Sequence, residues 1–284
     1  MAESRRVTVS DANTRNRLAR TRVSGYRDEA ARMDLLIQTF FLRPYVFGFL
    51  VAYLVLAVRD MGPRRTLLFS GWTCAVAWTA EFTSTRVGIP FGLYHYTGTT
   101  RFEELFISNV PFFDSMSFVF LAYAAYCLAR FLLRRQQGLP VVGLAGVLMM
   151  LLDVVIDPLA VRGDRWFLGR IFYYPDGGAL FGVPLSNFAG WVIVGWVAIE
   201  GFMLIGGRAP VRSPNGGVAL YYGILAFSLV IAWWIREPML FGLGVLLHVS
   251  LLLVVWACYA VNGNRAARRA FASGSQSAFE YTDR

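Results

Sequence analysis

Seven apolar runs of membrane-spanning length determine what this chain can fold into. They lie at about 44–59, 66–82, 110–132, 139–160, 184–206, 218–235 and 238–261. A bilayer-spanning helix needs about 20 mostly apolar residues, and only helices or closed barrels satisfy their backbone hydrogen bonds within lipid. Since 56% of the 284 residues are hydrophobic and only 16% are charged, the sequence predicts an all-α, polytopic transmembrane helix bundle of about seven spans.

Polar segments flank the predicted bundle. Residues 1–34 contain eight arginines and lack the apolar stretch of a cleavable signal peptide. We expect a basic polar N-terminal tail at 1–34, a transmembrane helical domain at 35–261 and a polar C-terminal tail at 262–284. Residues 35–42 are expected to form an interfacial helix that ends at Arg43-Pro44, because proline restricts the residue before it.

The residue types that are scarce exclude several classes of membrane protein. All 27 basic residues are arginines, so no lysine can form the Schiff base of a seven-helix retinal protein. Two histidines are too few for the iron site of membrane desaturases and hydroxylases, and the three cysteines form no CxxC pair. The arginines lie in the tails and between spans, where they meet lipid headgroups. We therefore expect the lipid bilayer, and not nucleic acid, as partner.

Acidic residues inside or beside the apolar runs are the main functional signal. There are six of them: Glu81, Asp114, Asp153, Asp157, Glu200 and Glu237. Ionised carboxyls are costly in hydrocarbon, so such acids favour the neutral form and usually mark sites. Because successive spans alternate in direction, all except Glu200 fall on or near one membrane side. The long, aromatic and glycine-rich connections 83–109 and 161–183 lie on that same side.

The first motif joins Glu81 to the loop 88–96 (GIPFGLYHY). Glycine and proline let the backbone turn back at the membrane surface. Phe91, Tyr94 and Tyr96 can line an apolar site while the hydroxyls orient water or a carboxyl. An interfacial aromatic belt would explain the tyrosines alone. Because Glu81 lies beside this loop, we favour a functional site.

The second motif is the pair Asp153 and Asp157, in the sequence DVVIDP. Residues four apart share a helix face, and two acids so close in a low dielectric cannot both ionise cheaply. One of them is therefore expected to hold a proton, as general-acid catalysis requires. The structural alternative is an ion pair with Arg86, Arg162 or Arg165 that closes the helix end.

The third motif is the segment 184–191 (PLSNFAGW). Proline is favourable near a helix start, which places Asn187 just inside the bundle, where its amide can orient a carboxyl or a water molecule. The alternative is a helix cap, with Trp191 as an interface anchor. Asp114, shortly after Pro111, is either a second proton carrier or a solvated charge at a helix N-terminus.

In their order between residues 81 and 191, these three blocks resemble the integral-membrane carotenoid hydratases, the family of carotenoid 1,2-hydratases and bisanhydrobacterioruberin hydratase. The resemblance implies a hydratase that adds water across the terminal 1,2 double bond of an acyclic carotenoid in a prokaryotic cytoplasmic membrane. Other carotenoid-pathway enzymes are candidate partners. The chain departs from the family in its third span, where Asp114 lies in a phenylalanine-rich segment.

The residues fit the implied chemistry. Protonation of the less substituted alkene carbon gives a tertiary cation that water captures, so no redox cofactor is required, and no dinucleotide fingerprint is present. Neither metal nor cofactor is predicted. The candidate catalytic residues are Asp153, Asp157, Glu81 and Asp114. The candidate substrate-binding residues have rings that can stabilise a cation or polar groups that can orient water. They are Phe91, Tyr94, Tyr96, Asn187 and Trp191.

Other functions start from the same residues. A carotenoid cyclase would also begin with protonation and would end by proton loss. A proton-coupled transporter or a carotenoid-binding protein without activity would use the acids as a relay through the bilayer, with Glu200 and His248 as its far members. A DxxxD box also occurs in membrane prenyltransferases that bind magnesium diphosphate, but this chain has no second DxxxD box.

Overall fold

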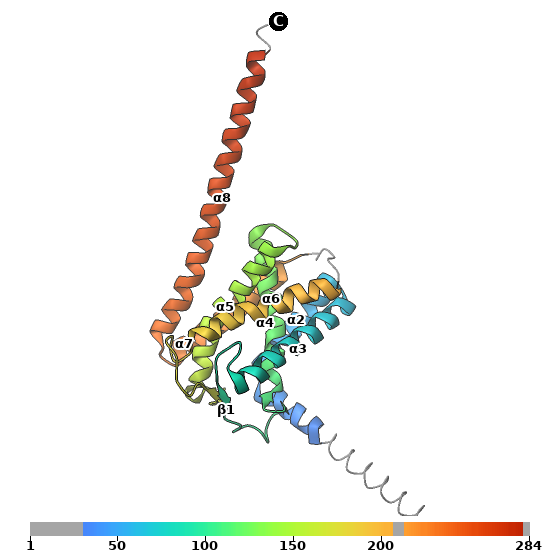
Figure 1. The fold of residues 1–284 in the computed structure, drawn as a ribbon, viewed down its shortest axis with the longest axis vertical. Coiled ribbons are helices and arrows are strands. Elements are labelled where there is room, and N and C mark those ends of the chain that lie inside the picture. Colours follow the sequence, from blue (N-terminus) through green and yellow to red (C-terminus); the bar gives the residue numbers. More distant parts are fainter. Residues whose placement is uncertain (1–30, 207–212, 281–284) are drawn as a thin grey trace, which may run out of the picture.

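Seven long helices form a bundle in the computed structural model, which describes residues 31–206 and 213–280, with side chains as far as Tyr259 (Figure 1). They are α2 Pro44–Met61, α3 Pro63–Val87, α4 Phe112–Leu133, α5 Leu139–Val161, α6 Leu185–Gly206, α7 Asn215–Trp234 and α8 Pro238–Glu280. All except α3, which is of similar length but more polar, are long and apolar enough to cross a membrane. The predicted all-α transmembrane bundle is therefore confirmed.

The ends of the chain are only partly covered by the structure. Residues 31–42 are helical and the helix ends before Arg43, as expected from the Arg43-Pro44 step. The rest of the predicted N-terminal tail, residues 1–30, lies outside the described residues. Helix α8 continues to Glu280 and so runs through most of the predicted C-terminal tail. The domain limits themselves stay a prediction.

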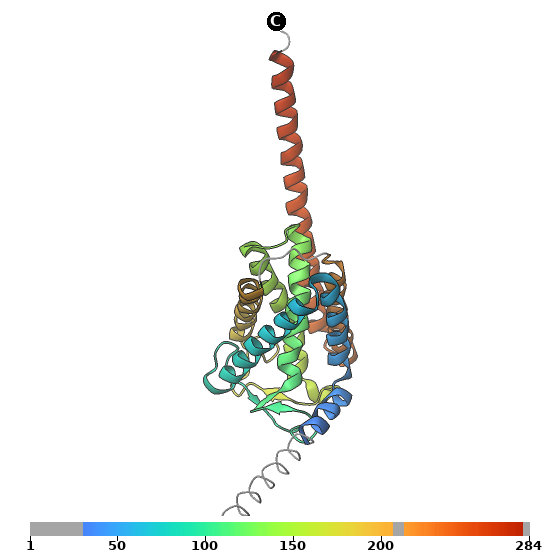
Figure 2. The same cartoon turned by 90° about the vertical axis from the view of Figure 1, so that its right-hand side faces the viewer.

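Helix α4 is the centre of the bundle. It packs against α2, α3, α5 and α7, and Figure 2 shows it running between them. Within its apolar window 83% of residues are buried, compared with 22% for α2 and 17% for α8. Alanines and a cysteine along α4 allow neighbouring helices to approach it closely, and its buried aromatic rings pack into the core between them. The other helices are therefore placed by how they cover α4, and the outer faces of α2, α7 and α8 are left for lipid.

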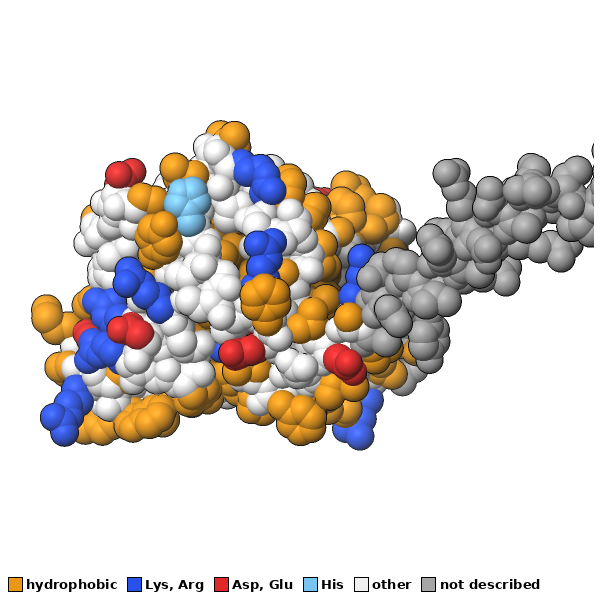
Figure 3. All heavy atoms as spheres, turned by 90° about the horizontal axis from the view of Figure 1, so that it is seen from below, with side chains coloured by type: hydrophobic (Ala, Val, Ile, Leu, Met, Phe, Trp, Pro, Cys, Tyr) orange, Lys and Arg blue, Asp and Glu red, His pale blue; other side chains and the backbone are white. Residues whose placement is uncertain are grey.

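The two long connections meet at one end of the bundle. Strand β1 (His95–Tyr96) of the first pairs antiparallel with β4 (Phe172–Tyr173) of the second, and β2 (Phe106–Ile107) pairs with β3 (Val110–Pro111). This pairing confirms the prediction from span alternation that both connections share one side. Figure 3 looks onto this end, where charged side chains lie among exposed backbone and hydrophobic side chains gather along an edge.

A buried ion pair fastens this end to the first helices. Arg43, directly before α2, pairs with Glu104 of the first long connection at 3.0 Å, and neither side chain is exposed to solvent. The Arg43 guanidinium also donates to the Leu168 carbonyl of the second connection at 2.5 Å and lies over the Phe113 ring. One arginine therefore ties α2, α4 and both connections together.

A second ion-pair cluster closes the turn between α7 and α8. Glu237 accepts hydrogen bonds from Arg162 at 3.2 Å and from Arg165. Burial would raise the pKa of Glu237, but these two guanidinium groups more than offset it and lower the pKa below its usual value. Glu237 is thus ion-paired at the turn rather than solvated as a free acid. The same contacts remove Arg162 and Arg165 as partners of the acid pair in α5.

The opposite end of the bundle has a polar network of its own. Asp60, near the end of α2, is buried and accepts hydrogen bonds from the Tyr123 hydroxyl at 3.0 Å and from the Ser213 backbone N–H at 2.8 Å. Arg130 of α4 lies 4.0 Å from its carboxylate. The His248 ring bonds to the Tyr221 hydroxyl at 3.1 Å and to the Gly244 carbonyl at 2.9 Å. These groups join helices and do not face the cavities described below.

The Arg43–Glu104 pair gives a prediction about stability. Replacing Arg43 by Met leaves Glu104 buried without its cation, which should cost about 3–5 kcal/mol. The double variant Arg43→Met/Glu104→Met should recover much of this loss, because neither charge is then left alone. Thermal unfolding of the detergent-purified protein measures both, with exposed Arg101→Met as control. An Arg43→Met variant as stable as the control would contradict this role.

Candidate active site

A single amide joins the two acids of α5. Asp153 and Asp157 lie one turn apart on the face that packs against α6, and Asn187 lies in the first turn of α6. The Asn187 Nδ2 atom donates to Asp153 Oδ2 and to Asp157 Oδ2, both at 2.7 Å. Asp153 and Asn187 are fully buried, and Asp157 is half-buried. The alternative of an ion pair at the helix end is therefore not what the structure shows.

The other two acids are held by hydroxyl groups. Asp114, in the first turn of α4, accepts a hydrogen bond from the Tyr96 hydroxyl at 2.6 Å. Glu81, near the end of α3, accepts one from Ser115 at 2.5 Å. Burial, followed by the nearby Asp114 and Glu81 charges, raises the pKa of the Tyr96 phenol well above its usual value. Tyr96 therefore stays a neutral donor toward Asp114 at physiological pH.

These groups surround a small polar cavity of about 30 Å³. Such a volume holds one or two water molecules, each of which needs polar partners. Its lining residues come from α3, α4, α5, α6 and both long connections: Glu81, Phe91, Tyr94, Tyr96, Asp114, Phe118, Asp157, Phe172, Tyr174, Asn187 and Trp191. Three carboxyl groups and three tyrosines therefore enclose a space of the size of water.

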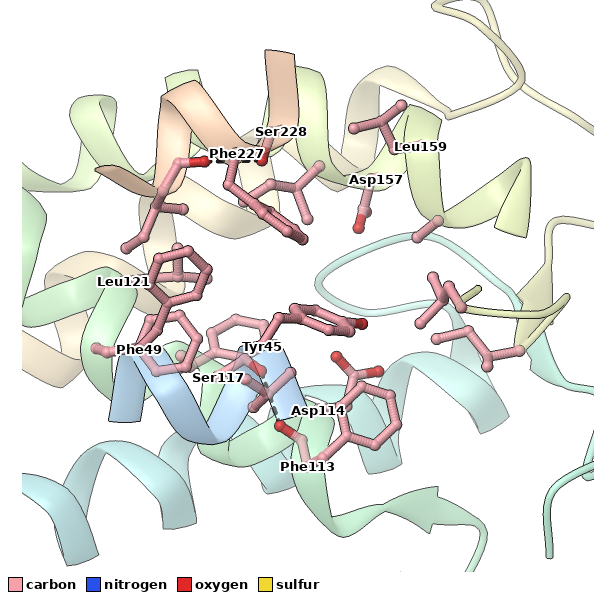
Figure 4. A pocket seen from close by; sticks show the side chains of 18 of the residues that line it. Tyr45, Phe49, Phe113, Asp114, Ser117, Leu121, Asp157, Leu159, Phe227 and Ser228 are labelled. Atoms are coloured by element: carbon pink, nitrogen blue, oxygen red, sulfur yellow. Dashed lines mark hydrogen bonds between the residues drawn. The ribbon is translucent and has the colours of Figure 1, made fainter. Parts of the chain in front are cut away.

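A larger, apolar cavity of about 110 Å³ lies against the polar one. It is enclosed by α2, α4, α5 and α7, by Trp191 of α6 and by the second long connection, and its wall is mostly aromatic and aliphatic. Asp114 and Asp157 belong to the lining of both cavities, and Figure 4 shows them reaching the apolar space from α4 and α5. Two carboxyl groups thus lie at the boundary between the apolar cavity and the polar cavity.

Aromatic rings complete the boundary. Trp191 of α6 stacks on Phe118 of α4, with ring centroids 4.2 Å apart and planes within 7°, and Phe91 packs against both. Trp191 is buried, so it is not the interface anchor that the sequence allowed.

Local backbone geometry explains why this loop can reach the helices. Gly88 ends α3 in the left-handed conformation, with φ of 75°, and the Phe91 N–H bonds back to the Ser84 hydroxyl at 3.0 Å. A side chain at Gly190 would lie 2.7 Å from the Phe91 ring and 2.8 Å from the Pro90 carbonyl oxygen. A glycine at 190 is therefore needed for the loop to pack on α6 and to place Phe91 beside Trp191.

The structure brings together the residues that the sequence singled out. Eight of the nine line the polar cavity, and the ninth, Asp153, is joined to it through Asn187. Glu200 and Glu237 line neither cavity. In the described parts of the chain, no group of three or more His, Cys, Asp and Glu side chains is arranged to hold a metal ion.

Sequence reasoning missed several members of the site. Ser115 holds Glu81, Phe118 stacks on Trp191, Phe172 lines both cavities, Tyr174 lines the polar cavity and Tyr45 lines the apolar one. Ser115 follows Asp114 in an otherwise apolar run, and Tyr174 belongs to an aromatic run in the second long connection, so both carried a usable signal. Phe118 and Tyr45 look like ordinary apolar residues of a span, and nothing in the sequence distinguishes them.

Comparison with known proteins identifies the family of this chain. The sequence model of a family described as carotenoid biosynthesis protein matches residues 41–252. Bisanhydrobacterioruberin hydratase from Haloarcula japonica is 31% identical over 183 residues, which cover 61% of this chain but only 58% of that relative. No solved structure matches the chain. The resemblance inferred from the three sequence blocks is confirmed at the level of the family: this chain is an integral membrane protein that belongs to the carotenoid biosynthesis protein family.

Proposed function

We propose that this protein is a carotenoid hydratase, which adds water across the terminal 1,2 double bond of an acyclic carotenoid in a prokaryotic cytoplasmic membrane. One observation carries the proposal: an apolar cavity and a water-sized polar cavity share Asp114 and Asp157 in their walls. An apolar end group in the first cavity and water in the second would meet at these carboxyls. The relative from Haloarcula japonica, which is named a hydratase, supports the same reaction.

The first step is proton transfer to the alkene. Asp153 and Asp157 share one amide donor in a buried site, so ionising both is unfavourable and the pair retains a proton. Asp157 reaches the apolar cavity, whereas Asp153 is buried behind it. The Asp157 carboxyl therefore gives its proton to the less substituted alkene carbon, and the former double-bond electrons form the new C–H bond. The other carbon becomes a tertiary cation.

The second step is capture of the cation by water. The rings of Trp191, Phe118 and Phe172 line both cavities and can stabilise the positive charge through their faces. A water molecule in the polar cavity attacks the cation, and its proton passes to the Asp114 carboxylate, which the Tyr96 hydroxyl keeps in place. The sum is one water added and no electron transferred. Return of the proton to Asp157 resets the site.

Cyclisation is the second candidate, because the same acid begins both reactions. A cyclase would lose a proton from the cation and would have no need for water beside it. The polar cavity has room for water at the shared wall, which favours hydration. The mass of the product separates the two: hydration adds the mass of one water and cyclisation leaves the mass unchanged.

Replacing the acid pair tests the first step. Expression in a lycopene-producing bacterium should give a pigment heavier by one water, detected by chromatography and mass spectrometry. Asp157→Asn and Asp153→Asn should each lower its formation by about 10²–10⁴-fold, the usual contribution of general acid–base catalysis. Asp164→Asn, an exposed acid in the second long connection, is the matched control. Full activity of both site variants at equal protein levels would refute the mechanism.

Removal of the Tyr96 hydroxyl tests the second step. Tyr96→Phe should lower the hydration rate by about 10- to 100-fold, since a hydrogen bond to a charged group contributes about 1.5–3 kcal/mol. Because its pKa is raised, the wild-type phenol remains protonated at pH values where exposed tyrosines ionise, near 10. Ultraviolet titration should therefore give the same phenolate absorbance for wild type and Tyr96→Phe at about pH 10. A smaller phenolate signal in the variant would mean that Tyr96 ionises normally.

A further inference from the structure

The apolar cavity is much shorter than a polyene. Its volume is about 110 Å³, while a protein cavity of about 150 Å³ holds a molecule the size of benzene. Along α4 its lining runs from Phe113 to Leu121, which is about 12 Å at the rise of an α-helix. The cavity can therefore hold at most one end group of an acyclic carotenoid, and only once a lining side chain has moved. The second long connection covers one end of the cavity, so the apolar remainder of the chain must leave toward lipid, between two helices.

The helices around the cavity differ in how deeply they are buried. The apolar windows of α4 and α5 are 83% and 61% buried, whereas those of α7 and α2 are only 44% and 22% buried. An exit between α4 and α5 would lead into the protein core. An exit between α2 and α7 leads toward lipid, because both helices have outward faces of exposed apolar residues.

Aromatic rings meet across the α2–α7 seam beside the cavity. Tyr45 of α2 stacks on Phe227 of α7, with centroids 5.3 Å apart and planes within 18°, and Phe49 meets the same ring edge-on at 5.6 Å. Among the described residues, no side-chain hydrogen bond or ion pair joins these two helices near the cavity. Ring contacts of this kind contribute about 0.5–1.5 kcal/mol each beyond their buried area, so rotamer changes can open the seam.

Tyr45 also fills the place that an end group would need. Figure 4 shows its ring lying between Asp114 and Asp157. On its outer side Tyr45 contacts Phe167, at 5.4 Å between centroids, and Phe167 is 49% exposed. The backbone before Tyr45 is fixed by the ion pair of Arg43 with Glu104. A rotation of the ring toward Phe167 would free the space beside both acids without moving α2.

We propose that the seam formed by Tyr45, Phe49 and Phe227 is a lateral portal for acyclic polyenes. The substrate enters from the bilayer with one end group first, displaces the Tyr45 ring, and keeps its remaining chain in the seam during the reaction. The proposal rests on the proposed function for the identity of the substrate. It adds that one end group is processed in each binding event and that the far end of the polyene is not recognised.

The test compares two substrates that share an end group. One is lycopene, and the other is a short acyclic terpene alkene that fits inside the cavity and leaves the seam closed behind it. Phe227→Trp and Phe49→Trp narrow the seam. Because both rings also line the apolar cavity, the short alkene reports how much each change affects the cavity itself. Phe241→Trp, an equal change on α8 that contacts Trp233 and lines neither cavity, is the matched control. Initial rates are measured with the purified full-length enzyme in lipid nanodiscs.

Each narrowing variant should lower kcat/KM for lycopene by at least about tenfold, which corresponds to about 1.4 kcal/mol. The value of kcat/KM for the short alkene should fall much less. The control should change neither value. Equal losses for the two substrates would indicate general damage to the site and would overturn the portal. Unchanged lycopene turnover in both narrowing variants would overturn it as well.

A binding measurement separates the portal from the chemistry. Lycopene retained by the Asp157→Asn protein after gel filtration is quantified by its absorbance, and Phe227→Trp is added to that variant. Reduced retention of lycopene in the double variant supports the portal. This holds even if the wild-type enzyme leaves the mass of lycopene unchanged, because that result contradicts only the hydratase proposal. Equal retention with and without Phe227→Trp refutes the portal even if hydration is observed.

Discussion

A carboxyl group in an apolar bundle needs a hydrogen-bond donor, and this requirement fixes the arrangement of helices around the site. The Asn187 amide satisfies two such groups at once, Asp153 and Asp157, and so sets how the start of α6 lies against the end of α5. Ser115 does the same for Glu81 between α4 and α3. Because an unpaired buried acid is expensive, these donors bring four helices to a common point.

In the proposed reaction, two physical tasks are divided between neighbouring cavities. The apolar walls would hold an end group by the hydrophobic effect, which is not directional, and the polar cavity would hold water by directed hydrogen bonds. Asp114 and Asp157 lie where the two environments meet, so a proton donor and a proton acceptor would face the reacting bond from α5 and α4. The ring pair Trp191 and Phe118 separates this point from the rest of the core. Protonation and water capture can then occur within one enclosed volume.

The two ends of the bundle use charge in different ways. At the end with the long connections, ion pairs such as Arg43–Glu104 hold loops over the site, and Arg162 with Glu237 closes the α7–α8 turn. At the other end, Asp60 and Arg130 join α2 to α4 beneath short connections. Guanidinium groups suit both places because they remain charged and donate several hydrogen bonds in one plane. Ion pairs therefore hold the connections that cover the site, whereas among the described residues the side of the site toward lipid is formed by aromatic rings without ion pairs.

The sequence by itself determined the helical bundle, the common side of the two long connections and nine candidate residues, eight of which line one polar cavity. Hydrophobic length and the alternation of spans are local properties, and acids are so costly in hydrocarbon that their positions point to candidate sites. Only the tertiary structure decided which donor serves which acid, that Glu237 is ion-paired, and that Tyr45 and Phe118 belong to the site. Those facts depend on rotamers and on contacts between residues far apart in the chain. An aromatic residue in an apolar run has the same local pattern whether it faces lipid, the core or a cavity.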